Sequence, residues 1–206
     1  MMQIKRTIKD GLESFSIPTT EESLEMLAAY IRELERWNKR INLTGIKEAE
    51  GIIGGLLFDT FFLYSYMKDM AKVIDVGSGS GIIAIPFAIL NRGMQVFAVD
   101  MDIKRFHFQR HIKRILNLKN LIPLHAKVEE LEYVKADGLV AKAFGSTEDV
   151  IQKGGRHLKM GGLAFILKGK KEEPSTFPDF LLRESIEYIL PSSDKAYRLF
   201  VYMRIQ

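Results

Sequence analysis

Three glycines at alternate positions, Gly77, Gly79 and Gly81, directly follow the mostly apolar run 73–76. A glycine-rich turn between a strand and a helix lets a ligand approach the main chain closely. It also directs the free N–H groups of the helix N-terminus at that ligand. Three glycines are a costly way to make a turn that binds nothing. This stretch therefore predicts a ligand-binding crevice in an α/β fold, and the absence of a following Gly-Lys-Ser/Thr excludes a P-loop.

The residues around the glycines bear on the identity of the ligand. The nicotinamide fingerprint is met in the frame Gly79-x-Gly81-x-x-Ala84, and a single match of this kind is weak. Asp75 precedes the glycines, and a carboxylate there opposes a pyrophosphate but suits the amine and sulfonium of S-adenosylmethionine. Asp100 lies nineteen residues beyond Gly81 and can accept hydrogen bonds from ribose hydroxyls, which both cofactors carry. The residues favour S-adenosylmethionine and leave a nicotinamide-dependent dehydrogenase open.

The pattern of apolar residues changes at about residue 72. Before it, Thr19 and Glu22 form a capping-box pattern that begins a predicted helix. Apolar residues then recur at helical spacing, and a second helix is expected over 48–67. We expect the charged N-terminus around Lys5 to be loose.

From residue 72 onward, short β-branched runs alternate with helical stretches. We expect strands at 72–76, 95–99, 121–124, 138–141, 163–167, 186–190 and 197–205, and helices at 82–90, 102–116 and 147–158. This alternation predicts a mostly parallel sheet with helices on both faces, which an antiparallel strand closes. The chain is thus predicted to hold an N-terminal helical part, residues 1–70, and a ligand-binding domain, residues 71–206.

Composition and length exclude several classes of protein. The chain of 206 residues contains no cysteine, so disulfides, thiolate zinc sites and cysteine nucleophiles are excluded. Its start leads into no apolar run, and we expect no secretory signal. The most apolar segment, 52–67, contains Asp59 and two glycines and is too short to span a bilayer. We therefore expect a cytoplasmic protein without a membrane partner, and the net charge of +4 mildly favours an anionic partner.

The chain offers no evident nucleophile, general base or metal site. Its four histidines are scattered, and no metal-ligand spacing stands out. Methyl transfer tolerates this, because a sulfonium is already activated and a ring nitrogen with a free lone pair carries no proton. Such a reaction needs alignment and desolvation more than acid–base catalysis. Lysines such as Lys127, Lys142 and Lys168 follow the predicted strands, and a lysine-lined mouth suits an anionic substrate.

Several motifs occur in a fixed order along the chain. They are Trp37-Asn38-Lys39-Arg40-Ile41-Asn42-Leu43-Thr44, the glycine loop 75–81, Ile85-Pro86, Asp100, Lys104-Arg105, Val128-Glu129-Glu130, Ala143-Phe144 and Leu167-Lys168-Gly169. Together they resemble the RsmG (GidB) family of small-subunit ribosomal RNA methyltransferases, which act on a guanine N7 with S-adenosylmethionine. The first motif is specific to that family, whereas the glycine loop is shared with many methyltransferases.

The resemblance implies a Rossmann-like class I methyltransferase fold, with a seven-stranded sheet behind an N-terminal helical extension. It implies that Gly77 and Ile82 border the methionine moiety, Asp100 holds the ribose, and Val128 and Glu129 contact the adenine. The expected cofactor-binding residues are Asp75, Gly77, Gly79, Gly81, Ile82, Asp100, Val128, Glu129 and Lys142. The expected RNA contacts are Arg36, Lys39, Arg40, Asn42, Lys104, Arg105 and Lys168. The expected partner is ribosomal RNA or the small ribosomal subunit, and the protein is expected to be a monomer.

The sequence departs from the family pattern in three places, which together involve five residues. Gly55-Leu56 stands where the family has an Arg-His pair, and Ile83-Ala84 follows the glycine loop in place of Pro-Gly. Lys142 replaces an arginine, which removes a bidentate fork. These departures leave an alternative open, a divergent paralogue that binds S-adenosylmethionine but methylates another RNA or only binds RNA.

Overall fold

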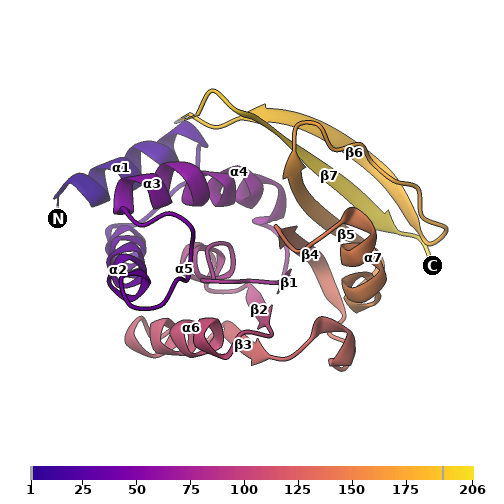
Figure 1. Ribbon diagram of the computed structural model, residues 1–206, viewed down its shortest axis with the longest axis horizontal. Coiled ribbons are helices and arrows are strands. Elements are labelled where there is room, and N and C mark those ends of the chain that lie inside the picture. Colours follow the sequence, from indigo (N-terminus) through magenta and orange to yellow (C-terminus); the bar gives the residue numbers. More distant parts are fainter. Residues whose placement is uncertain (1, 192) are drawn as a thin grey trace.

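The computed structural model describes residues 2–191 and 193–206, which form a seven-stranded sheet with helices on both faces (Figure 1). The strands are β1 (Lys72–Val76), β2 (Gln95–Asp100), β3 (Leu121–His125), β4 (Ala136–Lys142), β5 (Leu158–Gly169), β6 (Phe180–Ile189) and β7 (Ala196–Arg204). Their order in the sheet is β3-β2-β1-β4-β5-β7-β6. Strands β1 to β5 are parallel to one another, and β7 runs antiparallel between β5 and β6. The predicted fold is confirmed, except that β6 rather than β7 lies at the edge of the sheet.

Most helices lie close to their predicted positions. They are α1 (Met2–Ser14), α2 (Glu21–Asn38), α3 (Ala49–Ile52), α4 (Phe58–Met67), α5 (Ala84–Leu90), α6 (Ile103–Ile115) and α7 (Thr147–Gly154). A π-helical turn, η1 (Ile53–Leu57), joins α3 to α4, and the short 3-10 turns are η2 (Val128–Glu130) and η3 (Gly155–His157). The helix expected over 48–67 is thus confirmed, with its middle turn widened.

Two predictions for the N-terminal part are wrong. The first residues are not loose, because Ile8 and Leu12 of α1 are fully buried and Lys5 pairs with Glu21 of α2. The cap of α2 is Thr20 rather than Thr19, since the Thr20 hydroxyl accepts the backbone N–H of Ser23 at 3.1 Å.

Side chains alternate between the two faces of the sheet, and each face builds one part of the core. Val140 and Phe165 belong to the apolar cluster that contains the buried residues of α1, α2, α4, α5 and α6. Their neighbours Leu139 and Ala164 belong to a second cluster, with Val150 of α7. The N-terminal helices therefore share a core with the sheet. None of the helices in the described part of the chain has the length and apolar character that a membrane span requires.

Candidate functional site

The glycine loop follows β1 at the carboxyl edge of the sheet. The φ angles of Gly77, Gly79 and Gly81 are 69°, 57° and 75°, in the left-handed region that favours glycine. From α6, the buried Nε2 of Gln109 donates to the Ser78 hydroxyl at 2.8 Å and to the Gly79 carbonyl at 2.7 Å. The turn is therefore held in shape by the protein itself. The sequence reasoning missed Gln109, whose separation of about thirty residues from the loop gives no local signal.

The three glycines differ in what an added side chain would contact. A Cβ atom on Gly81 would lie 2.6 Å from the Ile85 side chain, so this glycine serves internal packing. A Cβ atom on Gly77 would lie 2.5 Å from the ring of Phe144. On Gly79 the nearest atom would be the carbonyl oxygen of Gly77 at 3.9 Å. Gly79 is thus the position at which the missing side chain leaves open space for a ligand.

Asp75 lies at the end of β1, beneath the loop. It is 2% exposed, and its Oδ2 accepts the backbone N–H of Ala84 at 3.2 Å. Burial raises the pKa of Asp75 to about 7, the Ala84 N–H opposes this shift, and the charge of Asp100 adds to it. The carboxyl group therefore braces the start of α5 and titrates near neutral pH.

Asp100 lies at the end of β2 and supports the loop from the other side. Its Oδ2 accepts the N–H of Gly79 at 2.8 Å, and its Oδ1 accepts the N–H of Asp102 at 2.8 Å. The guanidinium of Arg105 approaches the Oδ2 at 3.5 Å. The carboxylate is thus oriented by main-chain donors at the position that the sequence predicts for a ribose contact.

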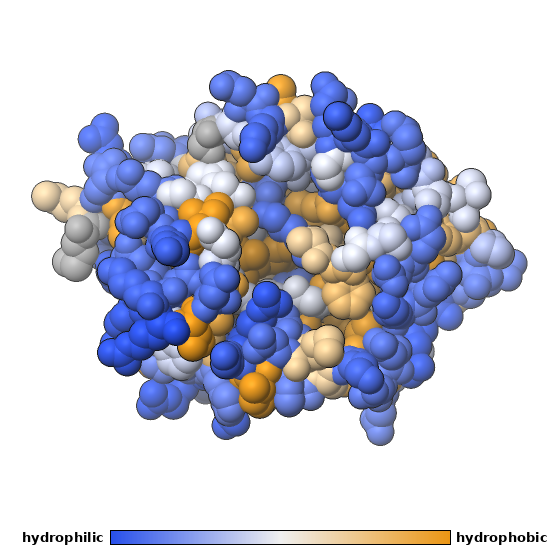
Figure 2. Space-filling view, in the orientation of Figure 1, coloured by the Kyte–Doolittle hydropathy of each residue, from blue (hydrophilic) through white to orange (hydrophobic). Residues whose placement is uncertain are grey.

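Two cavities open beside the glycine loop. Figure 2 shows a hollow near the centre of the molecule, with hydrophobic residues in and beside it and hydrophilic residues farther out. The first, of about 420 Å³, has Asp100, Val128, Glu129 and Phe144 among its lining residues. The second, of about 220 Å³, has Asp75, Gly79, Ile82 and Lys142 in its wall. Gly77, Arg105 and Ala143 line both cavities. Every predicted cofactor-binding residue except Gly81 therefore lines one of two adjoining cavities.

The loop 43–46 forms one wall of the second cavity, and Asn38 holds it there. Asn38 is 8% exposed. Its Oδ1 accepts the N–H groups of Leu43 at 2.8 Å and Thr44 at 3.0 Å, and its Nδ2 donates to the carbonyl of Ile46 at 2.7 Å. The family-specific W-N-K motif thus contributes a residue that shapes the cavity wall.

Two glycines, Gly51 and Gly55, lie beneath that loop, and Gly55 is one of the residues that depart from the resemblance. A Cβ atom on Gly51 or Gly55 would lie 2.7 Å or 3.0 Å from the side chain of Ile46. Ile46 therefore packs onto the helical surface that these glycines leave bare. A larger side chain at Gly55 would require the end of the Ile46 side chain to shift.

Lys142 enters the second cavity from the end of β4, and two distant residues fix its ammonium group. Its Nζ lies 2.5 Å from the Oδ2 of Asp59 on α4, and the Tyr188 hydroxyl on β6 donates to the Oδ1 of Asp59 at 2.7 Å. Asp59 is 2% exposed. Burial, together with the Asp59 charge, raises the pKa of Tyr188 far above its ordinary value. The network therefore holds one cation, the Lys142 ammonium, at the wall of the second cavity.

The segment after Lys142 is bent sharply. Ala143 has a φ of 57°, which is unusual for a residue with a side chain, and Gly145 follows with a φ of 94°. The Lys168 Nζ donates to the Gly145 carbonyl at 2.5 Å and holds this bend in place. Such local strain is typical of functional sites, and Ala143 lies between the two cavities.

The predicted RNA contacts fall into two groups. Five are exposed residues: Arg36, Lys39, Arg40, Asn42 and Lys104. Of the other two, Arg105 pairs with Asp100 while its side chain stays 41% exposed, and the Lys168 side chain is only 9% exposed. The position of Lys168 argues against a phosphate contact, and we do not propose one for it.

Comparisons with known proteins agree with this geometry. The model of the GidB family, described as rRNA small subunit methyltransferase G, matches residues 23–177. The ribosomal RNA small subunit methyltransferase G of Bordetella petrii is 31% identical over 172 residues, which cover 81% of this chain and 68% of the relative. The protein of the same name from Bordetella avium is 30% identical over 205 residues, covering 96% and 92% of the two chains.

Solved structures share the fold at lower identity. TrmN from Thermus thermophilus has a TM-score of 0.54 and 23% identity, covering 71% of this chain and 49% of that chain. A Burkholderia thailandensis N1-methyltransferase with bound 1,6-didemethyltoxoflavin and S-adenosylhomocysteine has a TM-score of 0.59 and 16% identity, covering 92% of both chains. These likenesses show the class I methyltransferase fold.

Proposed function

The chain belongs to the GidB family, the rRNA small subunit methyltransferases G, and from this membership we infer that it transfers a methyl group from S-adenosylmethionine to small-subunit ribosomal RNA. The family match over residues 23–177 carries this conclusion. The acceptor that goes with the family is a guanine N7. The same match argues against the nicotinamide-dependent dehydrogenase.

The residues of the site fit S-adenosylmethionine. Open space at Gly79 and the oriented carboxylate of Asp100 are what a ligand with a ribose requires. We propose that the adenosine occupies the first cavity, with Val128 and Glu129 beside the adenine, and that the methionine occupies the second, near Asp75. When bound, the cofactor supplies a methyl group that its sulfonium already activates.

The contribution of the protein is then positional and electrostatic. The N7 lone pair of a guanine carries no proton, so no general base is required. The carboxylates of Asp75 and Asp100 favour a positively charged ligand at the glycine loop. Lys142, which Asp59 and Tyr188 hold at the cavity wall, is our candidate for positioning the acceptor base.

We further propose that the protein acts as a monomer in the cytoplasm, on ribosomal RNA or on the small ribosomal subunit. This proposal is supported by three exposed cations that can contact RNA phosphates, Lys39, Arg40 and Lys104. Asn42 is exposed on the same segment as Lys39 and Arg40.

Mapping of N7-methylguanosine in small-subunit ribosomal RNA from cells that lack the gene tests the function. We expect the loss of one N7 methyl group and its restoration by the wild-type gene but not by Gly79→Arg. Gly161→Arg is the matched control, because Gly161 also has a positive φ of 73° and no atom within 4 Å of an added Cβ, but it lies away from both cavities. An unchanged methylation profile would refute the proposed function.

A further inference from the structure

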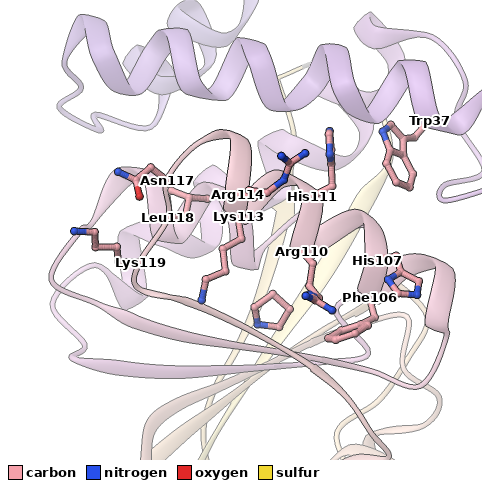
Figure 3. Close-up of a pocket in the computed structure, with 11 residues that line it drawn as sticks. Trp37, Phe106, His107, Arg110, His111, Lys113, Arg114, Asn117, Leu118 and Lys119 are labelled. Carbon is pink, nitrogen blue, oxygen red and sulfur yellow. The ribbon is translucent and has the colours of Figure 1, made fainter.

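A groove of about 870 Å³ lies beside α6, apart from the two cavities already described (Figure 3). Its charged lining residues are basic: Arg110, Lys113, Arg114 and Lys119, with His107 and His111 beside them. None of the described lining residues is acidic. The groove therefore concentrates positive charge on one surface of a protein whose net charge is only +4.

These cations are not neutralised within the fold. Arg110, Arg114 and Lys119 are exposed, and none of them makes an ion pair within the described part of the chain. The carboxylate of Glu33 is already engaged by Arg36 at 2.7 Å and by His111 at 2.8 Å. Arg110 and Arg114 lie one helical turn apart on α6, so their side chains are neighbours about 5–6 Å apart at their Cβ atoms. Figure 3 shows the Arg114 side chain beside His111 and the Arg110 side chain pointing the other way, so the two cations cover both sides of the helix.

Aromatic rings are interleaved with the cations. The guanidinium of Arg110 lies 5.6 Å from the ring centre of Phe106, and the ring of His125 stacks on Phe106 at 5.5 Å. On the other side, the Trp37 ring lies 5.1 Å from that of His111. Alternation of cations and planar rings is typical of surfaces that bind single-stranded nucleic acids, whose phosphates and bases both find partners there.

The groove leads toward the cofactor site along two elements. Trp37 also lines a neighbouring cavity of about 300 Å³, together with Arg36 and Arg40. The next residue, Asn38, holds the loop that walls the second cofactor cavity. On α6, Arg105 lines both cofactor cavities and directly precedes the groove-lining residues.

We propose that this groove binds the sugar–phosphate backbone of single-stranded RNA that flanks the methylated nucleotide, without regard to its sequence. The proposal rests on the proposed function, which supplies the RNA substrate, and it adds a docking surface outside the reaction site. The RNA contacts expected from the sequence included only Lys104 and Arg105 of α6. The structure assembles the charged residues of α6 beyond Arg105 with Trp37 of α2 into one basic groove.

Fluorescence anisotropy with a labelled, mixed-sequence 20-nucleotide single-stranded RNA tests the proposal. Arg110→Glu/Arg114→Glu is expected to weaken binding about tenfold or more, because two phosphate contacts become repulsive. The slope of log K against log salt is expected to shrink by about 1.4, since each phosphate contact on a single strand contributes about 0.7. The milder Arg110→Gln/Arg114→Gln is expected to show the same change of slope with a smaller loss of affinity.

The matched control is Arg183→Glu/Lys195→Glu, which makes the same change in net charge on the β6–β7 hairpin at the opposite edge of the sheet. We expect this control to bind RNA within about twofold of wild type, because Arg183 and Lys195 are exposed and lie away from the groove. All variants are expected to bind S-adenosylhomocysteine as the wild type does in isothermal titration, which shows that the fold and the cofactor site are intact.

The outcomes separate the two proposals. If the α6 variants bind RNA as tightly as the wild type, the groove is not an RNA-binding surface. An equal loss of affinity in the control variant also overturns the proposal, because net charge alone would then be responsible. Intact RNA binding with lost binding to a protein of the small subunit also overturns it. Weakened RNA binding in the α6 variants, with no methylation of small subunits by the wild type, supports the groove and refutes the proposed function.

Discussion

At the scale of single residues, Gly79 and Gly81 have the same left-handed backbone but different surroundings. An added Cβ at Gly81 meets the buried Ile85 side chain, whereas at Gly79 it meets open space. The same residue type therefore serves packing at one position and access at the other.

Alanine substitution separates these roles. Either change costs about 1 kcal/mol of unfolding free energy through the positive φ. We expect Gly81→Ala to lose about 1–3 kcal/mol more, because the added methyl overpacks the core. Gly79→Ala is expected to weaken S-adenosylhomocysteine binding while remaining the more stable variant. Urea unfolding and isothermal titration measure the two effects, and the reverse order of stabilities would contradict this assignment.

Asp75 gives the cofactor site a dependence on pH. Burial raises the folded-state pKa of Asp75 to about 7, well above the ordinary value for an aspartate. Its stabilising contribution is therefore full at low pH and declines as the pH rises toward 7. A cationic ligand favours the ionised carboxylate. We therefore expect the dissociation constant of S-adenosylmethionine to fall as the pH rises from about 6 to 7.5, with proton release on binding. Titration calorimetry in two buffers detects the released proton, and Asp75→Asn should abolish the dependence; a flat wild-type profile would disprove it.

At the scale of elements, Asn38 connects the last turn of α2 to the loop that walls the second cavity. Asn38→Ala leaves the N–H groups of Leu43 and Thr44 without their acceptor. We expect a loss of about 1–3 kcal/mol in the free energy of unfolding, and weaker cofactor binding. Asn42→Ala is the control, because Asn42 is exposed and four residues away on the same motif. Equal unfolding midpoints for the two variants in urea would show that Asn38 does not hold the loop.

The Tyr188 hydroxyl links the β6–β7 hairpin to α4 through Asp59. Because it donates to a buried carboxylate, Tyr188→Phe is expected to lower the unfolding free energy by about 1.5–3 kcal/mol. Tyr197→Phe serves as its control, since the Tyr197 ring stacks on Tyr188 but its hydroxyl has no hydrogen-bond partner among the described residues. Denaturant unfolding of both variants measures the difference, and a comparable effect in both would assign the stability to ring stacking.

The sequence predicts the local elements of the fold but not the contacts between distant ones. The strands and the glycine loop were predictable, because their signals are local: period-two runs, β-branched residues and alternate glycines. The anchoring of Lys142 was not predictable. Asp59 lies 83 residues from Lys142 and 129 residues from Tyr188 along the chain, so no local pattern links the three. The W-N-K motif was recognisable, but its spacing does not show that Asn38 turns inward while Asn42 stays exposed.

At the scale of the whole molecule, the helical part and the sheet are packed as one body. A single apolar cluster runs from Ile8 of α1 to Val201 of β7. Removing residues 1–70 would expose the part of the sheet that α4 contacts and the surfaces of α5 and α6 against which α2 packs.

We therefore expect a fragment of residues 71–206 to lack a cooperative thermal transition and to bind a dye specific for exposed apolar surface. Circular dichroism melting and dye fluorescence measure both, with the full chain as reference. A sharp transition in the fragment would instead show that the predicted boundary near residue 70 separates two independently folding domains.

The placement of β7 between β5 and β6 has a consequence for the order of assembly in the cell. A chain emerging from the ribosome delivers β5 and β6 before the strand that bridges them. Before β7 is synthesised, β6 cannot join the sheet, and Tyr188 cannot reach Asp59. Asp59, which holds the Lys142 ammonium, therefore gains its hydrogen bond from Tyr188 only in the last stage of biogenesis.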